Sequence, residues 1–371
     1  MSDFSWSSDQ QQFRQSVRRF FAAYSDEPAV RRAMATPEGH DPTVWAAMAS
    51  QLGVQGLAIP EAYGGGGFTI AEAAIVHEEA GRVLLCGPLL ASASLAAPAL
   101  TRIGGEAAER YLPDIASGAC VATLALNEPA GAWSARSTTT AAHPIGAGRY
   151  ALTGVKAYVL DGALADLLLV AARTDEGPGL FAVAADADGL VRTPQQTLDP
   201  TRRLARIELR DCPGTLLAAA GDAEASIAAA LTTGAIALAA EQVGGSERAL
   251  ELSVDHAKLR EQFGKPIGAF QAIRHRLADL YLAVETARSV ATHAALVAAR
   301  GGDATALAHL ARSACSRAYR DVSEAMIQVH GATGFTWEHV SQLYYKRARC
   351  DAELLGSPDE HRTALAAAVG L

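Results

Sequence analysis

Two short segments of the chain carry side chains that suit an anionic ligand. In the first, which reads REQFG, Arg260 can form two parallel hydrogen bonds to phosphate oxygens, while Gln262 and Phe263 supply a donor and a flat surface. In the second, Gln328 offers an amide, and Gly331 has no side chain to keep a ligand away from the backbone. Taken alone, Arg260 also fits a solvated arginine at a helix end, and Gln328 fits a surface amide.

The histidines and cysteines form no metal-binding pattern. The five cysteines are scattered and no pair has the spacing of metal ligands, so we expect reduced, mostly buried thiols. We expect His330 and His339 to pack against other side chains rather than bind a metal. The first ten residues lack the basic and apolar regions of a secretory signal. Together these features predict a cytoplasmic protein without a bound metal.

The composition argues against several classes of function. Half of the 371 residues are apolar, which is enough for a large core and two or three packed units. The net charge is −8, with lysine only at four positions, so we expect no nucleic-acid partner. We find no uninterrupted apolar run of roughly 18 residues and therefore expect no membrane crossing.

Helical, strand-like and again helical patterns follow one another along the chain, which predicts an α+β fold. Residues 1–118 should form an N-terminal helical domain, since apolar residues recur there at helical spacing. Residues 119–217 show short apolar or alternating runs broken by Gly, Pro and Asp, which predicts a middle β-domain. Residues 218–371 are rich in Ala and Leu with wide apolar stripes, which predicts a C-terminal four-helix bundle.

Five segments resemble signatures of the acyl-CoA dehydrogenases, which use FAD to desaturate acyl-CoA thioesters. The most specific matches are residues 260–280 and 328–339, and weaker ones are residues 53–82, 124–133 and 152–166. The resemblance covers nearly the whole chain. It implies the same order of an N-terminal helical domain, a middle β-domain and a C-terminal four-helix bundle.

The resemblance also implies which residues contact FAD. Arg260, Gln262 and Phe263 match the loop that, in this family, reaches the FAD of a neighbouring subunit. Gln328 and Gly331 match the helix end beside the adenosine and diphosphate. In the middle domain, Asn127, Tyr158 and Leu160 match residues that lie against the flavin ring, although Leu160 replaces a threonine that hydrogen-bonds near flavin N5.

The catalytic glutamate that the family uses has no counterpart. Of its two usual positions, the later corresponds to Leu355 and the earlier to Gly234, and neither residue can accept a proton from the substrate. Ala132, Trp133 and Ser134 replace a Gly-Ser-Asp of the family, so the bulk of Trp133 should obstruct the cleft. At helical spacing Glu353 would point about 160° away from Leu355, which disfavours it as a relocated base.

Three hypotheses about function remain open. The favoured one is the non-catalytic subunit of a heteromeric acyl-CoA dehydrogenase, in which a glutamate-bearing paralogue forms an α₂β₂ assembly and this chain completes the FAD site. Some actinobacterial dehydrogenases, notably those that act on steroid side chains, resemble such a pairing of two different family members. The alternatives are a self-sufficient homomeric dehydrogenase with a relocated base, and a family member with different chemistry. The resemblance implies an acyl-CoA or related thioester as substrate, and an electron-transfer flavoprotein or another protein as electron acceptor.

Overall fold

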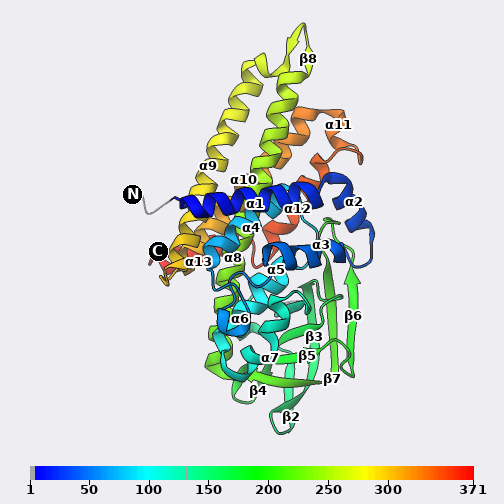
Figure 1. Ribbon diagram of the computed structural model, residues 1–371, viewed down its shortest axis with the longest axis vertical. Helices are drawn as coiled ribbons and strands as arrows, with labels where there is room; N and C mark the ends of the chain where they lie inside the picture. The colour runs from blue at the N-terminus through cyan, green and yellow to red at the C-terminus, as the bar shows by residue number, and fades with distance from the viewer. Residues whose placement is uncertain (1–4, 130–132) are drawn as a thin grey trace.

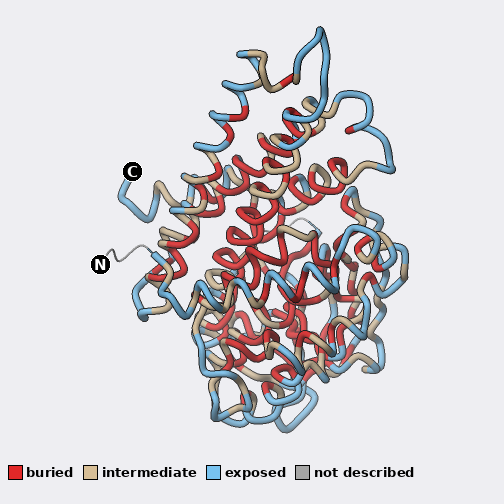
Figure 2. Tube along the Cα trace, turned by 45° about the horizontal axis from the view of Figure 1, so that its top comes forward, coloured by how far each residue is buried: buried red, intermediate tan, exposed pale blue. Residues whose placement is uncertain are grey.

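The computed structural model describes residues 5–129 and 133–371, and it has the α+β architecture that the sequence predicts (Figure 1). Helices come first, a sheet of strands lies in the middle of the chain, and helices follow again. Figure 2 shows that buried residues concentrate along the long helices and inside the sheet, whereas the loops and one protruding end are exposed.

The N-terminal helices begin at polar caps. Ser7 and Gln10 form a capping box at the first helix, and Thr69 and Glu72 form another at the fourth, so that each pair satisfies two amide groups. Their apolar faces then pack inward. The helices of this part are α1 (Ser8–Tyr24), α2 (Glu27–Ala35), α3 (Pro42–Ala47), α4 (Ile70–Arg82), α5 (Leu89–Ala91), α6 (Ala97–Ile103) and α7 (Gly105–Ala116).

The strands form a mostly antiparallel sheet around a leucine- and valine-rich core. The pairing path β4–β2–β3–β7–β5–β4 closes on itself, β1 joins it parallel to β4, and β6 joins β7. Strand β4 is buried from Leu167 to Ala172, which explains its unbroken apolar sequence. The strands are β1 (Ala122–Ala125), β2 (Ala141–Gly146), β3 (Arg149–Leu160), β4 (Leu167–Thr174), β5 (Gly177–Ala184), β6 (Leu190–Gln195) and β7 (Leu204–Ala218).

Long helices dominate the C-terminal part. Gly81 and Gly244 let α4 and the first of these helices cross closely, because a Cβ on either glycine would overlap a backbone oxygen of the other helix. The elements are α8 (Ala220–Leu259), β8 (Glu261–Gln262), β9 (Lys265–Pro266), α9 (Gln271–Ala299), α10 (Thr305–His330), α11 (Ala332–Phe335), α12 (Ser341–Glu353) and α13 (Pro358–Ala368).

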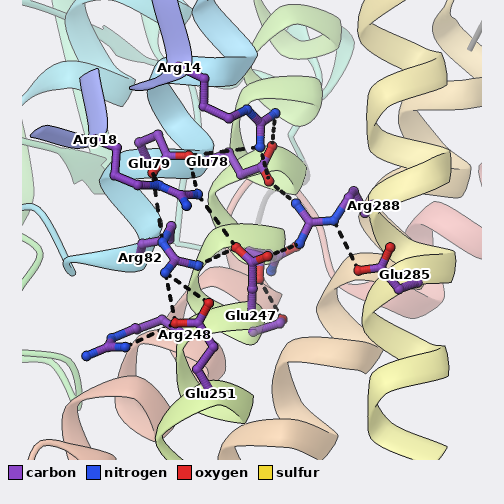
Figure 3. A network of polar contacts seen from close by, with 12 residues as sticks. Arg14, Arg18, Glu78, Glu79, Arg82, Glu247, Arg248, Glu251, Glu285 and Arg288 are labelled. Carbon is purple, nitrogen blue, oxygen red and sulfur yellow. Dashed lines mark hydrogen bonds and ion pairs between the residues drawn. The ribbon is translucent and has the colours of Figure 1, made fainter. Parts of the chain in front are cut away.

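A network of arginine and glutamate side chains ties the N-terminal helix to the bundle (Figure 3). Arg14 and Arg18 of α1 bind Glu78 and Glu79 of α4 at 2.7–2.8 Å. Arg288 of α9 binds Glu78 as well. Since the two α4 carboxylates are almost fully buried and each has an arginine partner, their charges are compensated.

Helix α8 bears on the expectation that no segment of the chain crosses a membrane. In the described chain it is the helix that is long and apolar enough, by length and composition alone, to cross a membrane, and 61% of its most apolar window is buried inside the protein. The search for an uninterrupted apolar run missed it, because a window average tolerates isolated polar residues. Its burial against α4, α9 and α10 is that of a core helix.

Candidate functional site

The residues around Arg260 form a hairpin that projects from the end of the bundle, at the top of Figure 1. Helix α8 ends where Arg260 leaves helical geometry, and β8 and β9 pair on either side of Phe263 and Gly264. These two residues have φ of 55° and 76°, as the central residues of a type I′ turn require. Phe263 is 91% exposed at the tip, and the side chains of Arg260 and Gln262 are exposed too.

The second predicted segment lies next to the base of this hairpin. Gln328 and Gly331 are exposed at the end of α10, and Gly331 has a φ of 63° that favours glycine. The rings of His256 and His330 lie 4.2 Å apart. His256 is one helical turn before Arg260, and His330 lies between Gln328 and Gly331. The structure therefore brings together the two segments that the sequence analysis singled out.

The predicted flavin-ring residues lie elsewhere, in the β-domain. The Ala157 amide donates to the Asn127 carbonyl at 2.9 Å, which joins the end of β1 to β3. The pairing of β3 with β7 shifts register between Lys156 and Val159, and within this bulge Tyr158 has a φ of 55°. A bulge re-aims a side chain, and Tyr158 is 48% exposed as a result. Asn127 is buried.

A buried ion pair holds the residues on either side of Asn127 in place. Lys156 Nζ lies 2.7 Å from Glu128 and also donates to the Leu126 carbonyl. Burial lowers the pKa of Lys156 to about 8, against the opposing effect of Glu128. Burial also acts to raise the pKa of Glu128, but Lys156 and the threonines at 138–140 hold it well below its usual range. Asn127 is thus fixed by its neighbours on both sides.

Leu160 belongs to the core. It is 3% exposed, and its carbonyl accepts a hydrogen bond of 2.5 Å from Thr123 Oγ1. Trp133 is half-buried and packs against the same apolar cluster. Of the three residues that replace the Gly-Ser-Asp, Ala132 lies outside the described residues. Trp133 and Leu160 thus add apolar bulk where the family has a serine and a threonine.

The two usual glutamate positions meet in space. A Cβ added to Gly234 of α8 would lie 3.1 Å from Leu355 Cδ1 and would overlap Leu95 Cδ2. Leu95 and Leu355 are 1% and 5% exposed. Leu95 lies on a π-helical turn, Ser92–Ala96, a local irregularity that the sequence did not reveal. Two leucines and a glycine therefore lie together, buried, at the positions that the resemblance assigns to the base.

The backbone that carries Leu355 is fixed by a buried arginine. Arg312 donates to the carbonyls of Asp351 and Leu354 at 2.6 and 2.9 Å. Helix α12 ends at Glu353, and Leu355 has a φ of 59°, in the left-handed region. The argument from helical spacing for Glu353 was therefore wrong in its premise, because Leu355 is not on the helix. Glu353 is nonetheless exposed, away from the buried Leu355.

The acidic side chains that follow in sequence have other roles. Asp351 is buried and pairs with Arg202 at 2.7 Å. Glu360 accepts from the Ser357 amide at 2.7 Å in a capping box of α13, and Asp359 pairs with Arg362. These three carboxylates are thus engaged elsewhere and, like the exposed Glu353, do not serve as a base at Leu355.

A histidine is the nearest remaining candidate for a base. His361 lies beside Gly356, and its Nδ1 is 2.8 Å from His309 Nδ1. Its buried Nε2 has no partner within residues 5–129 and 133–371. Burial, Arg312 and His309 lower the pKa of His361 to about 3. Such a weakly basic imidazole is poorly matched to proton abstraction near neutral pH.

Comparison with known families agrees with this geometry. A model described as "Acyl-CoA dehydrogenase, N-terminal domain" matches residues 7–119, and one described as "Acyl-CoA dehydrogenase, C-terminal domain" matches residues 225–370. Acyl-CoA dehydrogenase IpdE2 of Mycobacterium tuberculosis is 36% identical over 364 residues, covering 95% of this chain and 94% of that protein. The chain belongs to the acyl-CoA dehydrogenase family, whose members depend on FAD.

Two solved structures with similar folds carry names that give two different proteins each. A variant of the Tcur3481-Tcur3483 steroid ACAD has a TM-score of 0.88 and 28% identity, with 98% of each chain covered. The ChsE4-ChsE5 complex from Mycobacterium tuberculosis has a TM-score of 0.91 and 28% identity, with 100% of this chain and 99% of that chain covered.

The residues fit FAD unevenly. Arg260, Gln262, Phe263 and Gln328 are exposed and could bind a diphosphate and its adenosine. Asn127 Oδ1 is buried without a partner in the described residues, so it can accept a hydrogen bond from a flavin N–H. The usual position of the base does not fit the reaction, because Leu95 and Leu355 bury it in hydrocarbon.

Proposed function

We propose that this chain is the non-catalytic subunit of a heteromeric acyl-CoA dehydrogenase. A paralogue that carries the glutamate would perform the dehydrogenation, and this chain would complete its FAD site. The observation that carries the proposal is the contact between Gly234, Leu355 and Leu95. It fills both usual positions of the base with buried hydrocarbon and leaves a proton at the substrate without an acceptor.

The position of the hairpin supports a role in a second subunit. Arg260 and Phe263 project from the end of the bundle, far from the β-domain of the same chain (Figure 1). An aromatic side chain that is 91% exposed on a residue with positive φ is unfavourable in an isolated chain. Both features are expected if the tip packs against a partner and its cofactor.

In this assembly the roles divide between the chains. FAD supplies the hydride acceptor, and this chain's Arg260 and Gln328 bind its diphosphate and adenosine from across the interface. The partner's glutamate removes the proton next to the thioester carbonyl. An electron-transfer flavoprotein or another acceptor would then take the electrons from the complex.

A steroid-derived acyl-CoA is the proposed substrate class. Its support is the likeness to the Tcur3481-Tcur3483 steroid ACAD at 28% identity, together with the two-chain naming of that structure and of the ChsE4-ChsE5 complex. The comparison to run is FAD reduction by steroid side-chain acyl-CoAs against straight-chain acyl-CoAs of similar mass. Faster reduction by straight-chain substrates would contradict the substrate class.

The first test of the proposal is FAD content. The chain should be nearly colourless when expressed alone and should form a yellow complex when co-expressed with a glutamate-bearing paralogue. Arg260→Ala should lower FAD occupancy of the complex, since it removes a charge-assisted contact of roughly 1.5–3 kcal/mol. Arg149→Ala, which removes an exposed arginine at the start of β3 in the β-domain, is the matched control. Full FAD occupancy of the lone chain, unaffected by Arg260→Ala, would reject the proposal.

The second test is activity. Anaerobic mixing with acyl-CoA should bleach the flavin of the complex but not that of the lone chain reconstituted with FAD. Loss of a general base lowers rates by ~10²–10⁴-fold. Replacing the partner's glutamate by glutamine should abolish bleaching in the complex. Rapid bleaching by the lone chain would instead favour a self-sufficient enzyme with a relocated base.

A further inference from the structure

Three histidines form a continuous stack between the two proposed FAD-binding segments. The His256 and His330 rings lie 4.2 Å apart, and the His330 and His339 rings lie 4.5 Å apart. They come from the last turn of α8, the last turn of α10 and the segment before α12. All three are partly exposed. We call these residues the histidine stack.

Hydrogen bonds hold two of these rings in place. His330 Nδ1 lies 2.8 Å from the Met326 carbonyl, which can only accept, so Nδ1 carries a proton. His339 Nδ1 lies 2.8 Å from Ser341 Oγ and 3.2 Å from the Ser341 amide nitrogen. The Nε2 atoms of both rings are therefore the ones left to face a ligand.

Charged groups from α2, the end of α8 and the end of α10 act on two rings of the stack. Burial, His330, His339 and Arg260 all lower the pKa of His256. Burial and His330 lower the pKa of His339, where Glu27 of α2 acts to raise it and Arg31 of α2 acts to lower it. Positive groups thus outnumber negative ones around His256 and His339.

The stack is not arranged as a metal site. Across residues 5–129 and 133–371, no group of three or more His, Cys, Asp and Glu side chains could hold a metal ion. The groups that act on the pKa of His256 and His339 are mostly positive, with Arg260 and Arg31 set against the single carboxylate of Glu27. An anion bound here would favour the protonated imidazoles and would find donors already in place.

We propose that His256, His330 and His339 form, with Arg260, a proton-linked subsite for the diphosphate of the dinucleotide. This inference rests on the proposed function, because it assumes that the diphosphate lies beside Arg260 and Gly331. Binding of the diphosphate draws at least one proton onto the stack from solvent. The imidazolium ions then donate hydrogen bonds to phosphate oxygens.

The coupling between proton binding and diphosphate binding gives the direction in which affinity changes with pH. Since the bound state holds more protons than the free state, the dissociation constant must fall as pH falls through the pKa values of the bound stack. The slope of log Kd against pH equals the number of protons taken up, so one proton corresponds to a tenfold change per pH unit. We expect this slope at pH values between the pKa of the bound stack and that of the free stack, where burial and positive neighbours hold His256 and His339 below the unperturbed value of about 6.5.

The first experiment uses the full chain alone and does not depend on a partner. Histidine-labelled protein is titrated by NMR between pH 5 and 8.5 with and without ADP-ribose, a diphosphate diester that has no group titrating in this range. Adenosine is the control ligand, and exposed His143 of β2 is the control residue. A rise in pKa of at least one stack histidine with ADP-ribose, and not with adenosine, is expected. Equal titration curves under all three conditions would overturn the inference.

The second experiment measures the pH dependence of FAD affinity in the heteromeric complex. His330→Asn retains a donor for the Met326 carbonyl, and His339→Asn retains an acceptor for the Ser341 amide, so both preserve the local fold. Together with His256→Gln they should flatten the pH profile, whereas His143→Gln should leave it unchanged. If the unmodified complex binds FAD with an affinity that does not change with pH, the subsite is rejected and the proposed function stays intact. In another outcome, the two chains form no FAD-containing complex while ADP-ribose still raises the pKa of a stack histidine. That result rejects the proposed function and leaves the subsite intact.

Discussion

At Leu355 the backbone conformation is one that a leucine rarely adopts. Its φ of 59° lies in the left-handed region and costs roughly 1–3 kcal/mol for such a side chain. The bonds from Arg312 to the Asp351 and Leu354 carbonyls hold the chain in place just before it. Contact with Leu95 and Gly234 then places the side chain in hydrocarbon. The backbone bend is present, but the residue in it cannot exchange a proton.

Replacing Leu355 tests whether this place is an apolar core or an open cleft. Leu355→Met conserves volume and should cost less than about 1.5 kcal/mol. Leu355→Glu should cost about 3 kcal/mol or more at pH 8, because it buries a carboxylate without a partner. Burial raises the folded-state pKa of the new carboxyl, so the penalty should shrink from pH 8 to pH 5 as the group is protonated. Urea unfolding at both pH values gives these differences. Equal stability of the two variants at pH 8 would mean that the site is hydrated.

The buried pair of Lys156 and Glu128 allows a second test at this scale. Glu128→Gln leaves a fully buried ammonium group without its counter-ion and should cost about 3–5 kcal/mol. Lys156→Met should cost less, because Glu128 still accepts from Thr138, Thr139 and Thr140. Thermal or urea unfolding at pH 7 measures both. A smaller cost for Glu128→Gln than for Lys156→Met would contradict the assigned roles.

The sequence predicted the missing base but not what replaces it. Leu355 and Gly234 could be identified because motifs on either side fix their alignment. Leu95 could not, since its contact with Gly234 depends on a π-helical turn that has no sequence signal. His256 had a signal that was overlooked: it lies four residues before Arg260, one helical turn away. Nothing in the sequence placed it next to His330.

At the scale of elements, buried charges join the β-domain to the bundle. Arg347 of α12 reaches Asp199 at 3.0 Å and Glu241 of α8 at 2.5 Å. Arg202, which lies between β6 and β7, reaches Glu241 at 2.7 Å and Asp351 at 2.7 Å. These arginines therefore set the position of α12 and of the segment that leads to Leu355.

Glu241 is the shared carboxylate of this junction. Glu241→Gln should destabilise the fold by about 3–5 kcal/mol, since it leaves Arg202 and Arg347 undercompensated in the interior. Burial acts to raise the pKa of Glu241, but the two arginines hold it well below its usual range. A depressed folded-state pKa stabilises the protein above the unfolded pKa of about 4.3, and this stability is lost as pH falls below it.

Chemical unfolding between about pH 5 and pH 2 measures the effect, since the loss begins near the unfolded pKa and continues toward the lower folded one. The unmodified protein should lose stability over this range more steeply than the Glu241→Gln variant, which has already lost the pair. Glu285→Gln, in the half-exposed network of α9, is a control that should cost about 1 kcal/mol or less. Parallel pH profiles for the Glu241→Gln variant and the unmodified protein would contradict the role given to this carboxylate.

Strand and helix positions were predictable where one periodicity dominated. Residues 119–217, where short apolar and alternating runs predicted strands, contain β4 from Leu167 to Thr174 and β7 from Leu204 to Ala218. In residues 218–371 the expected apolar stripe includes Leu277, Leu280 and Val284, which are buried on α9. The signal for the end of α12 was overlooked, because Gly356 and Pro358 follow shortly after Glu353 and are typical of a helix end. What the sequence did not reveal is that Arg312 binds the Asp351 and Leu354 carbonyls there.

At the scale of the whole molecule, the chain carries two incomplete sets of site residues in different places. Asn127, Tyr158 and Leu160 lie with the sheet, whereas Arg260, Gln262 and Phe263 lie on the hairpin at the other end (Figure 1). One set therefore cannot complete the other within a single chain. A symmetric or pseudo-symmetric assembly brings the hairpin of one chain to the cofactor of another.

This arrangement predicts where a partner protects the chain from hydrogen exchange. In the lone chain the hairpin from Leu259 to Phe270 has few buried contacts, and both Leu259 and Phe263 are more than four-fifths exposed. Its amides should therefore exchange through local openings of low free energy. In the FAD-containing complex with the glutamate-bearing paralogue, exchange there should slow by about tenfold or more, which corresponds to about 1.4 kcal/mol of added local stability. The exposed turn around Gly148, between β2 and β3, is the internal control and should be unchanged. Protection of that turn without protection of the hairpin would place the partner at the opposite end of the molecule, and Arg260 could then not reach its cofactor.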